Sequence, residues 1–195
     1  MNKPFAQSCE NNKQAILNVL KTAFNDVHNV VEIGSGTGQH ALHFAHNLPH
    51  LQWHTSELLE NHQGINQWID ETSLTNLHKP IELDLNKPWP VDVTEGIFTA
   101  NTLHIVSWAL VVKFFAGVGE HLAENGVLCI YGPFKYNGEF TSASNGEFDL
   151  WLKGRDQHSG IRDIEAIETL AKSVGLVISA DYDLPANNRL LVFKR

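Results

Sequence analysis

The chain has 195 residues, of which 43% are hydrophobic and 18% are charged, a composition typical of a globular domain and too apolar for a disordered chain. It has 14 basic and 22 acidic residues, so its formal net charge is −8 with neutral histidine. This charge argues against nucleic acid or an anionic membrane as a partner, because either would favour a basic surface.

Cysteine usage and hydropathy bear on the cellular compartment. Cys9 and Cys129 form no CxxC pair, which is typical of proteins in a reducing compartment. No apolar segment follows Met1–Pro4, and the longest apolar run, 105–118, is interrupted by Lys113 and is too short to span a membrane. We therefore expect a cytoplasmic protein without a signal peptide.

Helical and strand patterns alternate through the first half of the chain. Apolar residues at helical spacing predict helices, and short apolar or alternating runs predict strands. The expected elements are a helix over 12–24, a strand over 29–33, a glycine-rich turn over 34–38, a helix over 39–47, a strand over 52–57, a helix over 61–71 and a strand over 81–85. Pro88 and Pro90 then indicate a loop around Trp89.

The second half continues this alternation. The expected elements are a strand over 96–101, a helix capped by Ser107 and reaching about 123, a strand over 127–131, a long polar segment over 132–160 with a short helix at 147–153, a helix over 161–174, and strands over 176–182 and 189–194. Strands that alternate with helices predict a parallel sheet covered on both faces. Because no helix separates the last two strands, they predict an antiparallel hairpin at the sheet edge.

The segment most informative about function is Val30–Gly38, with the sequence VVEIGSGTG. Three glycines between a strand and a helix allow a tight turn and the close approach of a nucleotide-like ligand. Gln39 stands where the dinucleotide fingerprint GxGxxG has its third glycine. The carboxylate of Glu32, just before the turn, favours a cationic ligand group and would repel a pyrophosphate. A tight turn without a ligand is the alternative interpretation.

Two further acids stand at the ends of predicted strands. Glu57 lies about 20 residues beyond the glycine-rich turn, where a carboxylate can accept hydrogen bonds from both ribose hydroxyls. Asp84 ends the next strand, where it could accept a hydrogen bond from an adenine amino group. Either acid alone is also compatible with a solvated loop. Together they predict a nucleoside site at the carboxyl edge of the sheet.

The glycine-rich segment resembles motif I of class I S-adenosylmethionine-dependent methyltransferases. Over nearly its full length, the chain resembles the methyltransferase-like 26 family, catalogued as domain of unknown function 938. The resemblance rests on Ser8–Glu10, Asn12–Lys13, Glu32–Ile33, Gly36–His40, Asn101–Ile105, Tyr131–Phe134, Ser144–Asn145, Gly160–Asp163 and Pro185–Asn188.

The resemblance implies an α/β, Rossmann-like methyltransferase fold with a seven-stranded, mostly parallel sheet and an antiparallel last strand. It implies S-adenosylmethionine as the cofactor, with S-adenosylhomocysteine as the product. The cofactor-binding residues that it implies are Glu32, Gly34, Ser35, Gly36, Thr37, Gly38, Glu57, Asp84 and Asn101. In such enzymes the motif I acid, here Glu32, reaches the methionyl amine, usually through water, and Asn101 would flank the methionyl part.

The expected domain organisation is a single domain over 1–195. An N-terminal helical segment (about 5–24) and a lid-like insertion (about 133–160) should flank the acceptor, because a connection this long inside a compact domain is usually functional. The expected substrate-binding residues are Asn12, Tyr136, Asn145 and Asp149. The aromatic residues of the 133–160 segment suit a small molecule with an aromatic or apolar part, although they could equally pack on the domain.

His104, just beyond the fourth strand of the predicted parallel series, is the best-placed general base, if the acceptor has to lose a proton. The alternative is a histidine that packs at the entry of a helix beneath the lid. The sequence Asn101–His104 departs from the Asn/Asp-Pro-Pro-aromatic motif common in enzymes that methylate base amino groups, which argues against DNA or RNA as the acceptor.

No metal is expected. His43 and His46 share the solvent face of the predicted helix, and no cysteine or carboxylate nearby completes a ligand set. The predicted function is therefore methyl transfer to an unidentified small molecule. Two alternatives stay open: a non-catalytic cofactor-binding scaffold or regulatory protein, and a nicotinamide-dependent oxidoreductase, which Gln39 and Glu32 disfavour.

Overall fold

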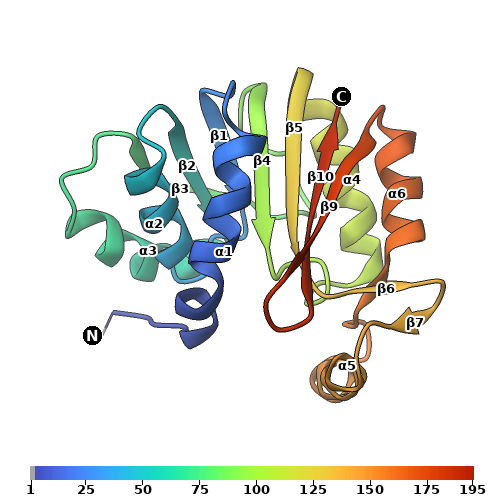
Figure 1. The fold of residues 1–195 in the computed structure, drawn as a ribbon. Helices are drawn as coiled ribbons and strands as arrows, with labels where there is room; N and C mark the ends of the chain where they lie inside the picture. Colours follow the sequence, from blue (N-terminus) through green and yellow to red (C-terminus); the bar gives the residue numbers. More distant parts are fainter. Residues whose placement is uncertain (1–2) are drawn as a thin grey trace.

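The computed structural model describes residues 3–195, which form an α/β fold around a seven-stranded sheet with the order β3-β2-β1-β4-β5-β10-β9 (Figure 1). The strands of this sheet are β1 (Asn29–Ile33), β2 (Gln52–Glu57), β3 (Leu77–Glu82), β4 (Thr94–Ala100), β5 (Leu122–Gly132), β9 (Val177–Leu184) and β10 (Asn188–Lys194). The helices are α1 (Gln7–Ala23), α2 (Gln39–Asn47), η1 (Leu59–Asn61), α3 (His62–Asp70), α4 (Trp108–His121), α5 (Ala143–Arg155) and α6 (Ile164–Ser173).

The direction of the strands confirms the predicted topology. β1 pairs with β2 and β4 in parallel, β2 pairs with β3 in parallel, and β4 pairs with β5 in parallel. β10 is antiparallel to both of its neighbours, β5 and β9. The last strand of the chain is thus the antiparallel strand of an otherwise parallel sheet.

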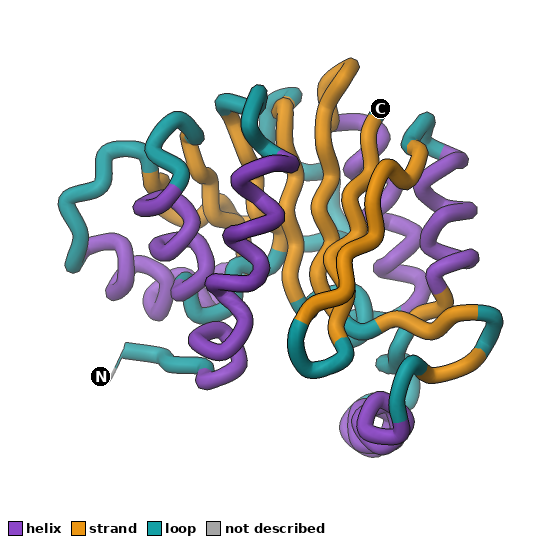
Figure 2. Tube along the Cα trace, in the orientation of Figure 1, coloured by secondary structure: helices purple, strands orange, loops and turns teal. Residues whose placement is uncertain are grey.

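Helices cover both faces of the sheet (Figure 2). α1, α2 and α3 pack on one face over a core that includes Trp53, Phe44 and Phe98. α4 and α6 pack on the other face, where Phe114 and Phe115 are buried. Neighbouring residues of the central strands face opposite layers, which explains their continuous apolar runs. Across residues 3–195, the longest and most apolar helices still fall short of what a membrane crossing requires.

Three elements begin four or five residues earlier than predicted. α1 begins at Gln7 instead of residue 12, because tertiary hydrogen bonds hold its polar first turns. β3 covers Leu77–Glu82 instead of 81–85 and contains Pro80. A proline is tolerated there because β3 is an edge strand and needs no hydrogen bond on its outer side. β5 begins directly after α4, five residues earlier than predicted.

The segment predicted as a long polar connection has structure of its own. It contains β6 (Phe134–Tyr136) and β7 (Glu139–Phe140), which join β8 (Arg162–Asp163) in a second, three-stranded sheet. α5 spans Ala143–Arg155, longer than the predicted helix at 147–153, and the Ser142 hydroxyl accepts a hydrogen bond from the Asn145 amide at its first turn. α5 and the N-terminal segment both lie at the carboxyl end of the parallel strands (Figure 1).

Trp89 provides a test of packing on the α4 face. Its indole is 7% exposed and lies so close to Gly117 that an added Cβ would stand 2.3 Å from the ring. Gly117→Ala should therefore lower the free energy of unfolding by about 1–3 kcal/mol through overpacking, as measured by urea denaturation. Gly154→Ala is the control, because its Cβ meets open space in α5, and it should be neutral or stabilising by up to about 1 kcal/mol. Equal stabilities for the two variants would contradict this packing.

Candidate functional site

The loop between β1 and α2 is fastened to the end of β2 by backbone hydrogen bonds. The amides of Gly34 and Ser35 both donate to the Ser56 carbonyl, at 3.1 and 2.9 Å. The Gly36 amide donates to the Glu57 carboxylate at 3.0 Å, and Leu58 donates to the other carboxylate oxygen at 2.8 Å. Because β1 and β2 are parallel neighbours, the loop and the acid converge at one edge of the sheet.

Backbone conformation explains the glycines of this loop. Gly36 has a φ of +56° and an added Cβ there would meet no protein atom within 4 Å. Gly34 has a φ of +76°, and its Cβ would stand 2.9 Å from the Thr102 hydroxyl. The loop therefore needs glycine for its left-handed conformation, and at Gly36 it leaves free space as well.

A cavity of about 310 Å³ lies between the ends of β2 and β3. It is lined by Ile33, Gly34, Glu57, Leu58, Leu83, Asp84, Leu85, Asn86, Thr102, Val106 and Leu110. Its walls are mainly apolar, and the carboxylates of Glu57 and Asp84 stand among them. Asp84 accepts a hydrogen bond from the Asn86 amide at 2.9 Å and so is fixed in the turn beyond β3. We name this space the strand-end cavity.

A second cavity, of about 500 Å³, lies on the other side of the turn that follows β4. It is lined by Ser8, Asn12, Asn101, His104, Ile105, Pro133, Ser144, Asn145, Phe148, Trp151, Arg155, Ala186 and Asn188. We name it the α5 cavity, because that helix supplies one wall. Thr102 of this turn lines the strand-end cavity, and its neighbour Asn101 lines the α5 cavity.

Asn101 stands in an uncommon backbone conformation. Its φ is +57°, in the left-handed region that few residues other than glycine adopt, and its amide donates to the Tyr131 carbonyl at 2.9 Å. Such outliers concentrate at functional sites, where the surrounding structure holds them. The conformation places Asn101 between the strand that ends there and the α5 cavity.

His104 also lines the α5 cavity but is 5% exposed. Burial and, to a lesser extent, the charge of Arg162 lower its pKa to about 4, so the ring is neutral at pH 7. Its ring lies 5.5 Å from that of Phe148 in an edge-to-face arrangement. His104 can thus accept a proton from a ligand in the cavity, but only as a weak base.

Glu32 does not line any of the cavities described here. Its side chain is 1% exposed, and its carboxylate accepts a hydrogen bond from the Trp53 indole at 3.1 Å. Burial raises its pKa to about 7, and the negative charge of Glu57 contributes in the same direction. Near neutral pH this acid is therefore divided between its protonated and charged forms.

The four residues predicted to bind the substrate have different surroundings. Asn12 and Asn145 line the α5 cavity. Tyr136 lies outside the lining of that cavity and donates its hydroxyl hydrogen to Asp181 at 2.7 Å. Asp149, also outside the lining, is 3% exposed and accepts hydrogen bonds from the Ile161 amide and the Lys153 ammonium. All four side chains have partners within the protein, because Asn12 bonds with His40 and the Asn145 side chain donates to Thr141 and to the Asn187 carbonyl.

Hydrogen bonds from α1 and its preceding segment reach the glycine-rich loop and the start of α2. The Gln39 side chain accepts from the Ala6 amide at 2.6 Å and donates to the Glu10 carboxylate at 2.9 Å. His40, neutral because burial lowers its pKa to about 4, bonds with Asn12 at 2.7 Å. Sequence reasoning used Gln39 only as a departure from a fingerprint. The polar cluster at the start of α1 was the signal that could have located these contacts.

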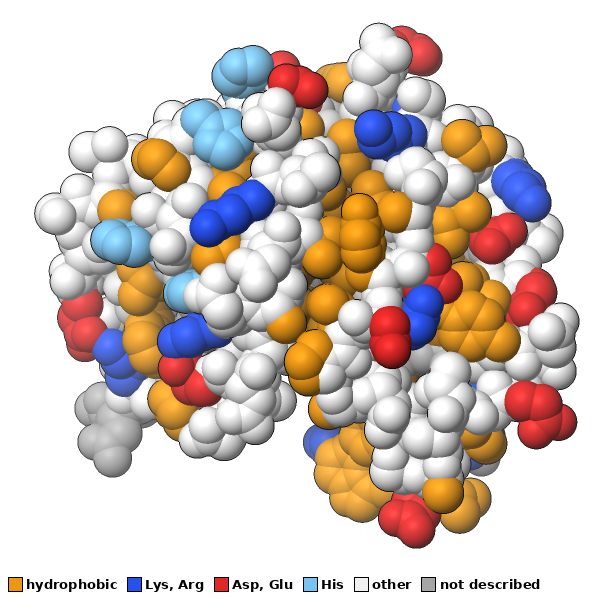
Figure 3. All heavy atoms as spheres, in the orientation of Figure 1, with side chains coloured by type: hydrophobic (Ala, Val, Ile, Leu, Met, Phe, Trp, Pro, Cys, Tyr) orange, Lys and Arg blue, Asp and Glu red, His pale blue; other side chains and the backbone are white. Residues whose placement is uncertain are grey.

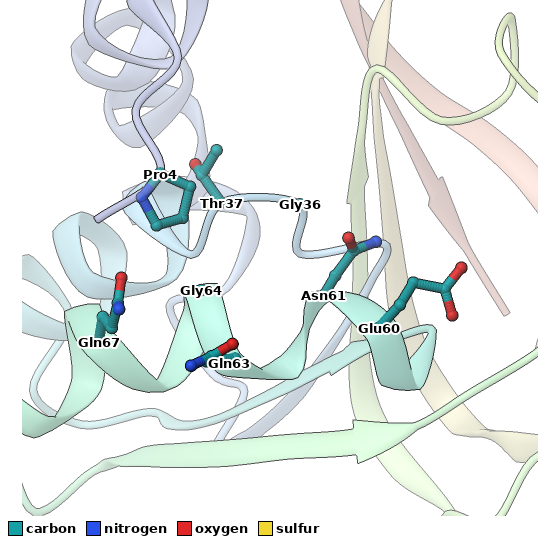
Figure 4. Close-up of a pocket in the computed structure, with 8 residues that line it drawn as sticks. All are labelled: Pro4, Gly36, Thr37, Glu60, Asn61, Gln63, Gly64 and Gln67. Carbon is teal, nitrogen blue, oxygen red and sulfur yellow. The ribbon is translucent and has the colours of Figure 1, made fainter. Parts of the chain in front are cut away.

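A third cavity, of about 400 Å³, lies on the outer side of the loop (Figure 4). It is lined by Pro4, Gly36, Thr37, Glu60, Asn61, Gln63, Gly64 and Gln67. Figure 4 shows α3 along one side of it, with Pro4 on the opposite side. Two of the predicted cofactor residues, Gly36 and Thr37, therefore border this space. The Ser35 hydroxyl instead accepts a hydrogen bond from the Ser56 amide of β2, and the Gly38 amide donates to the Ser35 carbonyl.

Of the histidines of α2, His40 is buried, His43 is partly buried and His46 is exposed. Figure 3 shows histidine side chains on the side of the molecule where α2 lies. Within residues 3–195, no group of three or more histidine, cysteine, aspartate or glutamate side chains gathers as a metal site would require.

The raised pKa of Glu32 predicts a pH-dependent effect on stability. Between about pH 4.5 and 7 the native state keeps a proton that the unfolded chain has released, so this residue's contribution to stability falls as pH rises. Glu32→Gln keeps an oxygen acceptor for Trp53 and removes this titration. The free energy of unfolding of the variant should rise relative to wild type by about 3 kcal/mol between pH 4.5 and 8. The exposed Glu124→Gln is the control, and parallel pH profiles for wild type and Glu32→Gln would contradict the prediction.

The fold of this chain is similar to that of solved methyltransferases. An O-methyltransferase family protein from Burkholderia thailandensis matches with a TM-score of 0.83 and 16% identity, over 94% of this chain and 56% of that one. The O-methyltransferase NcsB1 from neocarzinostatin biosynthesis, solved with S-adenosylmethionine and 2-hydroxy-5-methyl naphthoic acid, gives 0.78 and 15%, over 95% and 54%. Human N-acetylserotonin methyltransferase, solved with S-adenosylmethionine, gives 0.75 and 15%, over 94% and 54%.

At these identities the likeness shows a shared fold, and the present chain spans about half the length of each of these proteins. A sequence family, in contrast, matches the chain over residues 3–195, almost from end to end. This match confirms the family, domain of unknown function 938, that the sequence motifs indicated. The solved methyltransferase structures confirm the predicted class of fold. The chain therefore belongs to the family described as protein of unknown function (DUF938).

Proposed function

We propose that this protein transfers a methyl group from S-adenosylmethionine to a small-molecule acceptor. The observation that carries the proposal is the pair of cavities on the two sides of the turn after β4, one with two carboxylates among apolar walls and the other bordered by α1 and α5. The solved methyltransferases with this fold, two of them with S-adenosylmethionine bound, support it.

The strand-end cavity suits the adenosine part of the cofactor. Leu58, Leu83 and Leu85 offer apolar surface for a purine, and Asp84 stands beside them as an acceptor for an amino group. Glu57 uses one lone pair of each carboxylate oxygen for a backbone amide, so each oxygen keeps capacity for a ribose hydroxyl. These residues would hold the nucleoside while the glycine-rich loop lies against the rest of the ligand.

The methionyl part would extend past Gly34 toward Asn101 at the turn after β4. Glu32 is buried beneath the loop, so an interaction with the methionyl amine would run through intervening water, and the hydrogen bond to Trp53 would hold the carboxylate in place. A nearby cation would also favour the charged form of this acid. Ser35, Thr37 and Gly38 would shape the loop that carries these contacts.

The α5 cavity would hold the acceptor. When bound, S-adenosylmethionine supplies an electrophilic methyl group, which a lone pair of the acceptor takes as the carbon–sulfur bond breaks. Asn12, Asn145 and the segment over 133–160 would orient the acceptor and exclude water, since alignment provides much of the rate in such a transfer. His104 would receive a proton only from an acceptor that is itself fairly acidic, because its pKa is about 4.

Glu57→Ala tests the nucleoside site. Ribose hydroxyls would lose a charged acceptor, and such hydrogen bonds are worth about 1.5–3 kcal/mol, so S-adenosylmethionine should bind roughly 10- to 150-fold more weakly in calorimetric titration. Glu124→Ala, an exposed acid at the start of β5, should bind as wild type does. Equal affinities for all three proteins would place the ribose elsewhere.

Gly36→Ala tests the space above the loop. The added methyl group meets no protein atom, so a loss of affinity beyond the effect of backbone strain would come from the ligand itself. We expect at least about tenfold weaker binding of S-adenosylhomocysteine. Gly138→Ala is the matched control, because that glycine has a φ of +80° and equally open space in the β6–β7 turn. A variant at position 36 that binds normally would show that the loop does not touch the cofactor.

Incubation with labelled S-adenosylmethionine and small-molecule extracts separates an enzyme from a scaffold. Transfer of label to a compound below about 1 kDa, dependent on Asn101 and on the integrity of the α5 cavity, is the expected result. Tight cofactor binding with no labelled product across such extracts would favour the non-catalytic alternative.

A further inference from the structure

One face of α5 forms a continuous wall of the α5 cavity. Ser144, Phe148, Trp151 and Arg155 all line it, and their spacing of three or four residues places them on the same side of the helix. The helix is thus aligned along the cavity, with each turn contributing one side chain. What this face offers to a ligand follows from the order of these side chains.

The wall is aromatic over most of its length. The ring of His104 lies 5.5 Å from that of Phe148, and the Phe148 ring stacks on Trp151 at 5.7 Å with an interplanar angle of 17°. Trp151 is 53% exposed although it borders a cavity. The uncovered part of the indole is therefore free to stack on a ring of a ligand.

Arg155 ends this series at the rim. Its guanidinium lies over the Trp151 ring, 4.9 Å from the ring centre. The other three arginines of the chain bind protein oxygens: Arg162 binds carbonyls, Arg189 binds two aspartates and Arg195 binds carbonyls. Within residues 3–195, the guanidinium of Arg155 makes no such hydrogen bond or ion pair, so its donors face solvent and the cavity.

Charge within the α5 cavity is one-sided. Among its lining residues Arg155 carries a full charge, His104 is neutral at pH 7, and no aspartate or glutamate is present. The acids nearest to this wall lie outside the cavity lining: Glu147 is exposed, Asp149 accepts hydrogen bonds from Lys153 and the Ile161 amide, and Asp156 accepts from the His158 amide. In a protein with a net charge of −8, this cavity is therefore a local exception.

We propose that the acceptor is a planar aromatic anion that lies along Phe148 and Trp151, with its acidic group at Arg155 and its nucleophilic atom toward Asn101. This inference rests on the proposed function for the direction of the acceptor, whereas the binding site itself rests on the α5 wall. Arginine suits such a group because its fork matches a carboxylate and its plane stacks on an aromatic ring.

The weak basicity of His104 is consistent with this acceptor. A phenolic hydroxyl loses a proton several orders of magnitude more readily than an aliphatic one, so it makes little demand on a base. An aromatic anion with an acidic hydroxyl thus matches both ends of the wall. Its hydroxyl would face the neutral imidazole, where the methyl group would arrive, and its anionic group would face the cation at the rim.

The test uses two matched planar probes, 6-hydroxy-2-naphthoate and the neutral 2-naphthol, which differ only in the carboxylate. Each is titrated by calorimetry into the full chain, with and without S-adenosylhomocysteine. Wild type should bind the carboxylate about three- to fivefold more tightly than the neutral probe, as an ion pair at a solvent-exposed rim allows. Trp151→Ala should weaken the binding of both probes.

Substitutions at Arg155 separate the effect of its charge on probe binding from the effect of the aromatic wall. Arg155→Gln should abolish the preference and leave the affinity for the neutral probe within about twofold, whereas Arg155→Lys should keep part of it. Lys21→Gln, which removes an exposed charge at the far end of α1, should keep the full preference. Circular dichroism and urea denaturation of each variant show whether the fold is intact.

The outcomes keep the inference and the proposed function apart. Equal affinities for the two probes in wild type, an unchanged preference in Arg155→Gln, or no saturable binding of either probe would overturn the aromatic-anion site. Failure of S-adenosylmethionine and S-adenosylhomocysteine to bind would overturn the proposed function. The probe titrations without cofactor would still decide whether the α5 wall takes an aromatic anion.

Discussion

The hydrogen bond from the Gly36 amide to the Glu57 carboxylate is the contact on which the geometry of the candidate site depends. It joins the loop after β1 to the end of β2, and the backbone hydrogen bonds to Ser56 hold the two together from below. Because parallel neighbours end at the same edge, an acid on one strand can fix the loop that follows the other. The strand-end cavity opens beside this junction.

The second constraint is the attachment of α1 to the loop and to α2. The Gln39 side chain forms hydrogen bonds with one residue just before α1 and with another in its first turn. Buried His40 bonds with Asn12, which lines the α5 cavity. Each buried polar group in this contact has a partner, so the helix has one position that satisfies them all. The proposed acceptor cavity is consequently bounded by α1 on one side and α5 on the other.

Much of the fold could be predicted because its central elements have strong local patterns. The predicted bounds of β1, α2 and β2 equal the observed ones, since each is a compact apolar or alternating run with clear breaks. β3 begins four residues before its predicted start and contains Pro80, which only the place of this strand at the sheet edge makes acceptable. The small sheet of β6, β7 and β8 was missed because its two- and three-residue strands have no usable periodicity.

The sequence by itself determined the order along the chain of the seven main strands and the helices between them, the glycine-rich loop and the placement of Glu57 at a strand end, because each depends on residues close together along the chain. Asp84, predicted to end a strand, lies two residues beyond β3. The tertiary structure alone decided what surrounds each side chain. In the folded protein, Glu32 accepts a hydrogen bond from the Trp53 indole, and burial raises its pKa. Tyr136 donates a hydrogen bond to Asp181, and Arg155 lies over an aromatic ring without an acidic partner among residues 3–195. The physical reason is that burial and pairing depend on contacts between segments far apart in sequence, and no local pattern encodes which of several acids or amides meets a given partner.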